Sequence, residues 1–335
     1  MTTTTLDPET LKRFTQTLSV GTACGPMARV LTDFFGEAFT RTLVPDGFCL
    51  FQKAGASPEQ LKAVFVAHMD EIGGCVYGRR ADGGFDCRFW GTKEPRLYAD
   101  APLQAMDYLA EDESSAFTVT GRVARDETGN DGGLASPERL ALDGEGIRPY
   151  RTVFTFRQDS AVDGDLLLGK AVDPRATTFA VCEAVRRLDD PAVGAVIVMA
   201  EECAMDVARK AVAFLQRRAP DLALVVNADV PSLANLGDAR LDLPAIRVFE
   251  GHNFIDPSFG IRVASQLMDE GVALHLSAAR SGSQTLLFTP LAPTLSIALP
   301  GDDIHAPLGR VSLTGITRCA DLLTAIGERK LAGRI

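Results

Sequence analysis

Residues 61–73 read LKAVFVAHMDEIG, an apolar run that ends in a histidine and two acids. An uninterrupted apolar run of this kind predicts a strand that is covered on both faces, as in a parallel sheet. Three further runs have the same character: AVGAVIVMA (192–200), LALVVNA (222–228) and TLSIALP (294–300). We expect these four segments to form the centre of one sheet.

Amphipathic segments alternate with these runs: ATTFAVCEAVRRL (176–188), MDVARKAVAFLQRRA (205–219) and SLTGITRCADLLTAIGERK (312–330). In the first, Arg186 and Arg187 lie near the end, where cations interact favourably with the helix dipole. Strands that alternate with helices predict an α/β sheet with helices on both faces.

Residues 77–150 differ from the rest of the chain. All four tyrosines and the only tryptophan, Trp90, fall in this stretch, together with short alternating segments such as FTVTGRVA (117–124). The pattern predicts a small all-β unit inserted into the α/β domain. The alternative is a long irregular excursion, which would be unusual inside a compact domain.

The composition is that of an ordinary globular protein, with 46% hydrophobic and 23% charged residues among 335. The net charge of −10 disfavours nucleic acid or an anionic membrane as the main partner, because a phosphate-binding surface needs positive potential. The first residues lack the pattern of a secretory signal, and no run is long and apolar enough to span a membrane. Seven scattered cysteines without a CxxC pair favour reduced thiols and a cytoplasmic location.

Chemically active side chains follow the predicted strands. In open α/β sheets, ligands bind just beyond the carboxyl ends of the strands. The side chains at these ends are His68, Asp70 and Glu71 after the first run, Glu201 and Glu202 after the second, Asp229 after the third and His305 after the fourth, and Asp173 lies just before a helix. We therefore expect them to converge on one edge of the sheet.

Imidazole and carboxylate ligands without thiolates suit Zn²⁺, Co²⁺ or Mn²⁺. A pair of such ions needs a shared anionic bridge, for which an aspartate is suited, and together they activate a water and polarise a carbonyl. His68 and Asp70 are two residues apart, so in an extended backbone both point to one side. Asp70 can then accept the free N–H of His68 and orient the ring.

Each of these residues also has a purely structural interpretation. Glu201 and Glu202 suit the first turn of a helix, and Asp173 suits an N-cap followed by Pro174, a role that it can combine with metal binding. Cys203 adjoins the acidic pair, but a small buried side chain is the better interpretation than a nucleophile. The convergence of five positions on one edge favours the metal site.

Several motifs resemble those of the cocatalytic metallo-aminopeptidases, the family of glutamyl aminopeptidases and tetrahedral (deblocking) aminopeptidases. AHMDEIG (67–73) is similar to the first metal motif of that family. Further similar motifs follow in the same order over nearly the whole chain: GIRPYRTVFTF and GDLLLGKAVDPR (146–175), AEEC (200–203), NADV (227–230) and ALPGDDIHAP (298–307).

This resemblance implies roles for the candidate residues. His68 and Asp229 would hold one metal, Glu202 and His305 the other, and Asp173 would bridge them. Glu201 would be the general base. The implied fold is a mixed-sheet α/β/α zinc-peptidase catalytic domain in two parts, 1–76 and 163–335, with a PDZ-like β-barrel at 77–162 that serves assembly or acts as a lid. Dodecameric homo-oligomers are implied as well.

The chain departs from the family pattern at four places: Pro174, the segment CAMDVARKA after Glu202, Asp302 and Asp303, and SGSQT (281–285). None of these changes removes a proposed ligand or the base. They alter the walls of the site, and the extra acids at 302–303 either attract cationic groups or are solvated loop residues.

The leading hypothesis is therefore a two-metal aminopeptidase, with Zn²⁺ or Co²⁺ favoured and Mn²⁺ possible, that removes N-terminal residues from short peptides. A second hypothesis keeps the metals and changes the substrate to a non-peptide amide or an N-acyl amino acid. A third, motivated by the changed segment after Glu202, is a metal-binding scaffold with weak catalytic activity.

Overall fold

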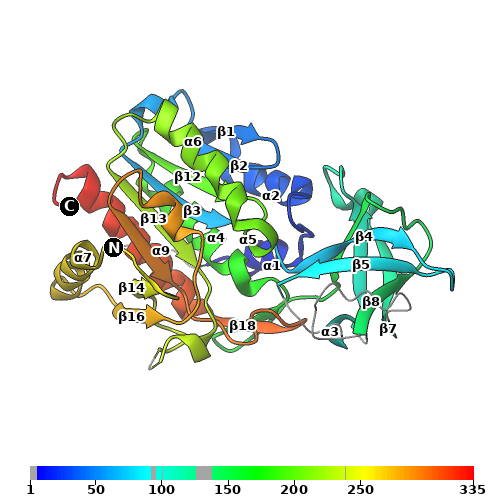
Figure 1. Ribbon diagram of the computed structural model, residues 1–335. Helices are drawn as coiled ribbons and strands as arrows, with labels where there is room; N and C mark the ends of the chain where they lie inside the picture. Colours follow the sequence, from blue (N-terminus) through cyan, green and yellow to red (C-terminus); the bar gives the residue numbers. More distant parts are fainter. Residues whose placement is uncertain (1–5, 92–95, 100, 126–137, 238) are drawn as a thin grey trace.

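A mixed β-sheet with helices on both faces forms the larger part of the molecule, and a closed β-barrel lies to one side of it (Figure 1). The computed structural model describes residues 6–91, 96–99, 101–125, 138–237 and 239–335. In spatial order the strands of the main sheet are β1 (Phe39–Val44), β2 (Phe48–Lys53), β12 (Val193–Val198), β3 (Ala63–His68), β13 (Leu224–Asp229), β17 (Thr294–Ala298), β14 (Ala245–Glu250) and β15 (Asn253–Phe254), and β16 (His275–Ala279) also pairs with β14.

The four predicted strands form the centre of this sheet and run parallel to one another, as β12, β3, β13 and β17. Every residue of β3, β12, β13 and β17 is buried, which explains why their sequences are apolar without alternation. The strand ends differ from the predicted ones, since β3 ends on His68 and β13 on Asp229. The prediction of a mixed α/β fold is confirmed.

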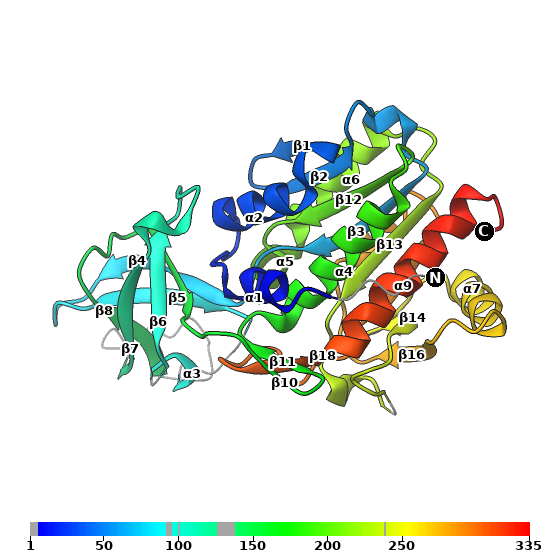
Figure 2. The ribbon, with the colours of Figure 1, turned by 180° about the vertical axis from the view of Figure 1, so that it is seen from behind.

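Helices cover both faces of the sheet. Figure 2 shows one face with α1 (Pro8–Gln16), α2 (Gly25–Phe35), α4 (Val172–Leu188) and α9 (Leu313–Leu331). The opposite face carries α6 (Ala208–Arg218) and α8 (Thr285–Phe288), while α7 (Pro257–Asp269) packs beside β14. Alternate residues of β3 enter the two cores: Phe65 packs into the core that includes α4, and Val64 into the core that includes α6. In the part of the chain that the structure describes, no helix combines the length and the apolar character needed to cross a membrane.

The barrel closes in the order β4 (Gly73–Arg79), β5 (Phe85–Trp90), β8 (Glu138–Asp143), β7 (Phe117–Arg125), β6 (Leu103–Asp107) and β9 (Thr152–Phe156), and the short helix α3 (Arg96–Ala99) packs against it. It has a hydrophobic core of its own, in which Tyr98 stacks on Phe156. Its strands span the stretch in which we expected an inserted all-β unit, and β4 begins before the expected boundary at residue 77.

The barrel is joined to the sheet domain at the residues that follow β3. Glu71 accepts hydrogen bonds from Thr155 Oγ1 of β9 (3.1 Å) and from Lys170 Nζ (2.6 and 2.8 Å). Lys170 lies between a small sheet, formed by β10 (Ala161–Asp163), β11 (Leu166–Gly169) and β18 (Gly309–Ser312), and the start of α4. Both side chains of this ion pair are buried. The Glu71 carboxylate, which follows β3, thus links β9 of the barrel to the segment between β11 and α4.

Candidate metal centre

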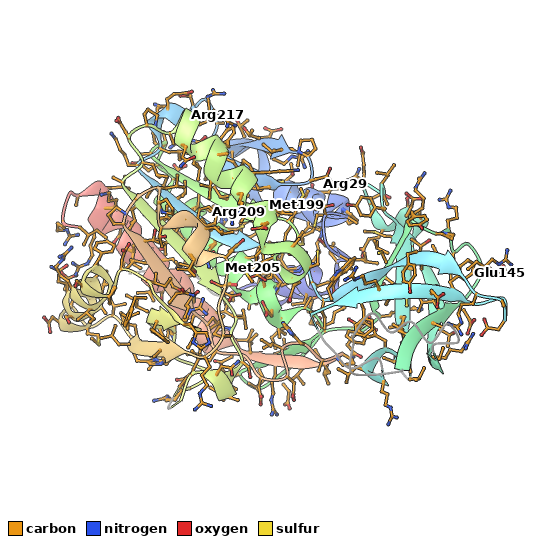
Figure 3. The ribbon with its side chains drawn as sticks, in the orientation of Figure 1. Arg29, Glu145, Met199, Met205, Arg209 and Arg217 are labelled. Atoms are coloured by element: carbon orange, nitrogen blue, oxygen red, sulfur yellow. The ribbon has the colours of Figure 1, made fainter. Side chains whose placement is uncertain are left out.

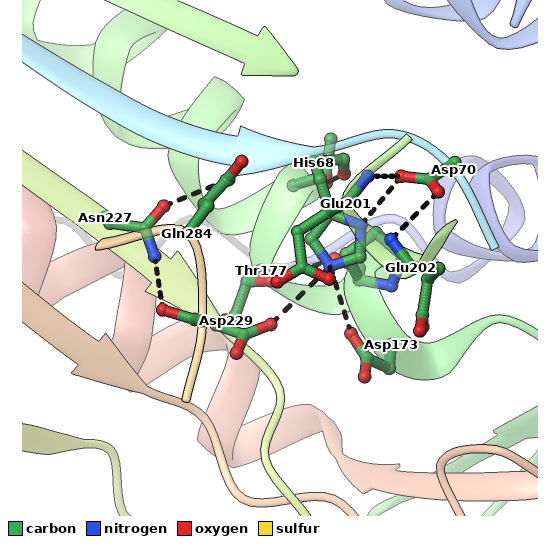
Figure 4. A network of polar contacts seen from close by, with 12 residues as sticks. His68, Asp70, Asp173, Thr177, Glu201, Glu202, Asn227, Asp229 and Gln284 are labelled. Carbon is green, nitrogen blue, oxygen red and sulfur yellow. Dashed lines mark hydrogen bonds and ion pairs between the residues drawn. The ribbon is translucent and has the colours of Figure 1, made fainter. Parts of the chain in front are cut away.

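The candidate residues meet at the carboxyl edge of the central strands, as the sequence predicts. Val66 of β3 pairs with Asn227 of β13 in parallel register, so His68 and Asp229 come level two residues later. Nε2 of His68 lies 3.6 Å from Oδ1 of Asp229. Figure 4 shows the His68 ring surrounded by Asp229, Asp173 and Asp70.

Two triads of potential metal ligands share one aspartate. The first consists of His68, Asp173 and Asp229, and the second of Asp173, Glu202 and His305, with one ligand atom from each residue lying within 4.8 Å of the others in its triad. Asp173 Oδ1 is 3.4 Å from His68 Nε2, and Asp173 Oδ2 is 3.3 Å from His305 Nε2. The two oxygens of one carboxylate therefore face different triads.

Local backbone geometry directs Asp173 into the site. Asp173 has extended dihedral angles (φ −89°, ψ 118°) at the start of α4, and Pro174 follows it. Its carboxylate contacts the histidines, and its Oδ1 makes no hydrogen bond with the described residues. Ala171 and Ala200, which precede the acidic ligands on two loops, have positive φ angles of 51° and 63°. Such strained angles are typical of functional sites.

Asp70 orients residues of both triads. Its Oδ1 lies 3.1 Å from Nδ1 of His68 and also accepts the backbone N–H of Glu201 (2.8 Å). Its Oδ2 accepts the backbone N–H of Glu202 (3.1 Å). The predicted contact between His68 and Asp70 is therefore present, and the same carboxylate also fixes the start of α5 (Glu201–Ala204).

Glu201 lies at the mouth of the first triad. Its Oε2 is 4.0 Å from Nε2 of His68, and its side chain is 12% exposed, so it remains accessible to a small substrate. Glu202, in contrast, points to the second triad, where its Oε1 is 3.1 Å from Nε2 of His305. The two adjacent acids therefore occupy different positions relative to the triads.

The site is rich in buried carboxylates. Burial raises the pKa of Glu201 well above its usual value, and the nearby carboxylates of Asp229, Glu202 and Asp173 act in the same direction. Burial also raises the pKa of Glu202. A cluster of buried carboxylates is stabilised by protonation or by compensating positive charge, and a bound divalent cation supplies the latter.

The imidazoles respond to the same charges. Burial alone would lower the pKa of His305, but contacts with Asp173 and Glu202 outweigh it and raise the pKa to about 11. The pKa of His68 is likewise raised well above its usual value by Asp173, Asp229 and Asp70, against the effect of burial. Asp173 Oδ1 and Glu202 Oε1 are buried without a hydrogen bond from the described residues. These two carboxylate oxygens lie beside the imidazole nitrogens of His68 and His305. Carboxylate oxygens and imidazole nitrogens are common ligands of divalent cations, so the residues fit a pair of such ions.

Two features of the sequence have no part in this arrangement. Burial raises the pKa of the Cys203 thiol to about 12, and the nearby Asp70 adds to this, so the thiol is not activated as a nucleophile. Asp302 is paired with Arg310, with Arg310 Nε donating over 2.9 Å to Asp302 Oδ2. Its charge is therefore at least partly compensated within the protein.

The sequence analysis missed polar residues behind the ligands. Arg247 is buried in β14, and its Nη2 lies 3.6 Å from Oδ2 of Asp229. Thr178 Oγ1 donates to the backbone carbonyl of His68 (2.6 Å). The sequence did hold a signal for Arg247. It is a charged residue inside the apolar run AIRVFE (245–250), where a buried strand usually has an apolar side chain.

The barrel approaches the second triad. A Cβ atom placed on Gly91, at the end of β5, would lie 3.3 Å from Oε2 of Glu202 and 1.9 Å from Cγ2 of Ile72. Gly91 has a positive φ of 80°, so a glycine is needed there for two reasons. In Figure 3, Met205, which directly follows α5, lies on the sheet domain, and Glu145 marks the far end of the barrel. The site therefore lies where the two parts meet.

No protein-family model matches the chain, and no curated protein matches it in sequence. Solved structures with the same fold include TET peptidases and other aminopeptidases, and two whose names include an endoglucanase. The TET1 peptidase of Pyrococcus horikoshii, described as able to form a tetrahedron or a large octahedral shell, is 18% identical with a TM-score of 0.77, covering 95% of this chain and 98% of its own.

Two more archaeal structures are similar. The TET aminopeptidase of Thaumarchaeota archaeon SCGC AB-539-E09 is 15% identical, with a TM-score of 0.79 and 98% of both chains covered. Aminopeptidase APDkam598 of Desulfurococcus kamchatkensis is 16% identical, with a TM-score of 0.74, 95% of this chain and 93% of its own covered. The chain has the fold of the TET aminopeptidases, which agrees with the resemblance seen in its motifs.

Proposed function

We propose that this chain is a two-metal aminopeptidase that removes N-terminal residues from short peptides. The observation that carries the proposal is the pair of ligand triads that share Asp173. His68 and Asp229 would hold one divalent cation, Glu202 and His305 the other, and Asp173 would bridge them. Zn²⁺ or Co²⁺ suits these imidazole and carboxylate ligands best, and Mn²⁺ is compatible with them.

Such cations, when bound, lower the pKa of a water and polarise the carbonyl of the scissile bond. Glu201 is the group we assign as general base. It would accept a proton from the attacking water and return it to the nitrogen of the leaving amine. The position of Glu201 supports this role, because its Oε2 lies 4.0 Å from Nε2 of His68 and Glu201 belongs to neither triad.

Asp70 is proposed as the residue that orients His68, Glu201 and Glu202 relative to one another. Its contacts with His68 and with the backbone of Glu201 and Glu202 support this role. Carboxylates that hold the second nitrogen of a ligand histidine fix its tautomer and orientation. Asp70 is therefore expected to affect both metal binding and turnover.

The inserted unit is proposed to span residues 77–162 between the two parts of a catalytic domain, 1–76 and 163–335, and to serve assembly or to act as a lid. The approach of Gly91 to Glu202 supports a role near the site. A PDZ-like identity of the barrel, a dodecameric particle and a cytoplasmic location remain parts of this proposal. Support for assembly comes from the P. horikoshii peptidase, which forms a tetrahedron or an octahedral shell.

A substrate panel tests the proposed activity. The purified protein, loaded with Zn²⁺ or Co²⁺, is assayed on aminoacyl-anilides, short peptides with free N-termini and N-acyl amino acids. We expect hydrolysis of the first two classes and none of the blocked compounds. Cleavage of the N-acyl compounds alone would replace the aminopeptidase with an amide hydrolase, and no hydrolysis with both metals bound would favour a scaffold.

A further inference from the structure

Arg247 is a buried cation in the middle of strand β14. Its side chain has no exposed area (0%), and its neighbours along the strand, Ile246 and Val248, are apolar. A guanidinium in such a place is costly unless its charge and its donors are matched by partners. The partners of Arg247 therefore indicate what the residue does.

Three side chains surround the guanidinium. Nε donates to Oγ of Ser296 (2.8 Å), and Nη2 lies 2.9 Å from Oε1 of Glu250. On the side of the metal centre, Nη2 lies 3.6 Å from Oδ2 of Asp229. Neither Nη1 nor Nη2 completes a hydrogen bond with the described residues. Nη2, the nitrogen nearest to Asp229, can therefore donate to Oδ2 of Asp229 after a small movement.

Glu250 is itself held in place by donors from the segment 281–285 and from β17. It accepts hydrogen bonds from the backbone N–H of Ser283 (3.1 Å) and from the hydroxyl groups of Ser283 (3.0 Å), Thr285 (3.2 Å) and Ser296. Ser283 and Thr285 belong to SGSQT (281–285), one of the places where the chain departs from the family pattern. This segment fixes Glu250, and Glu250 in turn fixes the guanidinium.

Asp229 is thus contacted on two sides. Its Oδ1 lies 3.6 Å from Nε2 of His68, and its Oδ2 lies 3.6 Å from Nη2 of Arg247. We propose that Arg247 is a positioning residue for Asp229, which holds Oδ2 so that Oδ1 faces the divalent cation in the His68 triad. This inference rests on the proposed two-metal function and adds a residue to it.

The effect should be unequal for the two cations. Arg247 contacts Asp229, which belongs to the first triad only, whereas the second triad is formed by Asp173, Glu202 and His305. Loss of the guanidinium frees the Asp229 carboxylate to rotate and leaves Glu250 as a second uncompensated carboxylate behind it. One binding step should weaken, and the other should not.

The test is a titration of the metal-free protein with Co²⁺, followed by calorimetry and by the visible absorption of the bound ion. We expect Arg247→Met to weaken one of two binding steps by about 10–100-fold, the usual effect of removing a group that orients a ligand. The other step should change by less than about 3-fold. Wild-type affinity at both steps in a folded Arg247→Met protein would overturn the proposal.

Two further variants keep the test decisive. Arg247→Lys retains the charge but lacks the planar fork that can face Glu250 and Asp229 together, so we expect a smaller weakening of the same step. If Arg247→Met does not fold, wild-type affinity in Arg247→Lys overturns the proposal.

Arg329→Met is the matched control. Arg329 lies in the last turn of α9, is also buried and pairs with Glu270. This substitution should lower the melting temperature and leave both steps unchanged, and equal weakening by both substitutions would overturn the proposal.

The wild-type titration separates this inference from the proposed function. Failure of the wild-type protein to bind two ions contradicts the two-metal centre itself. Two ions in the wild-type protein and unchanged affinity in the Arg247 variants contradict only the positioning role.

Discussion

Oδ1 of Asp70 lies 3.1 Å from Nδ1 of His68, and the same carboxylate receives the backbone N–H groups of Glu201 and Glu202. A single side chain with no exposed area therefore orients a ligand of the first triad, a ligand of the second triad and the proposed base. The proposed metal centre would depend on this carboxylate, although Asp70 belongs to neither triad.

Replacement of Asp70 by asparagine should weaken metal binding. The amide has the shape of the carboxylate but presents N–H groups to donors, so the contacts with His68, Glu201 and Glu202 cannot all be kept. We expect metal affinity to fall by about 10–100-fold, measured as metal content after dialysis against dilute Zn²⁺. Asp302→Asn is the control, because Asp302 pairs with Arg310, and an unchanged metal content in Asp70→Asn would disprove the role.

Replacement of Glu201 by glutamine should separate turnover from metal binding. The base is lost while the ligand triads are untouched, so kcat should fall by about 10²–10⁴-fold with metal content unchanged. The neighbouring substitution Glu202→Gln should instead lower metal content, because Glu202 belongs to the second triad. Near-normal turnover in Glu201→Gln would remove this residue from the mechanism.

Replacement of Gly91 by alanine should damage the second triad. The added Cβ would lie 1.9 Å from Ile72 Cγ2 and 3.3 Å from Glu202 Oε2, so the end of β5 must move away from the site. Gly83→Ala is a matched control in the same barrel, since Gly83 has a positive φ of 91° and a Cβ there would meet nothing within 4 Å.

Both substitutions carry a backbone cost of about 1–2 kcal/mol for a left-handed residue, and only Gly91→Ala adds about 1–3 kcal/mol of overpacking. Melting temperature and kcat/KM of the two variants measure the difference. Equal behaviour of the two proteins would show that the barrel does not contribute to the site.

The stability of the metal-free protein should fall as the pH rises above 6.5. The folded protein raises the pKa of His305 from 6.5 to about 11, so this group adds stability that is complete below 6.5 and is lost as the pH approaches 11. The raised pKa values of Glu201 and Glu202 act in the same direction. Asp173, with its pKa lowered to about 2, loses its contribution only below its ordinary value of 3.8, outside this range.

Bound cations should reverse this trend, because they replace protons on the same ligands. Melting temperatures measured from pH 6.5 to pH 9, with a chelator and with Zn²⁺, test the prediction. We expect the stabilisation by Zn²⁺ to grow with pH. A stabilisation that does not depend on pH would contradict the assignment of these side chains as ligands.

The sheet and the cluster of candidate ligands could be predicted from the sequence because both leave local signals. A strand that is covered on both faces must be apolar throughout, as AVFVA is, and the ligands follow at the strand ends, where the parallel register brings His68 level with Asp229. The contact between His68 and Asp70 could be predicted from their spacing alone, since alternate residues of an extended backbone point to one side.

Contacts between distant segments left no such signal. Arg247, Glu250 and Ser283 come together because β14 and the segment before α8 fold onto each other, and nothing local in the chain encodes that contact. The same holds for Gly91, whose approach to Glu202 depends on how the barrel sits against the sheet domain. Arg247 could be singled out as a charged residue in an apolar run, but its position beside Asp229 could not be predicted without the three-dimensional arrangement.

The central claim is that two cations share Asp173. Anomalous diffraction from a crystal of the metal-loaded protein tests it most directly, since it reports the number, identity and ligands of the ions together. The account predicts two ions, one bound by His68 and Asp229 and one by Glu202 and His305, with an oxygen of Asp173 on each. A single ion, or an Asp173 carboxylate that faces away from both histidines, would contradict it.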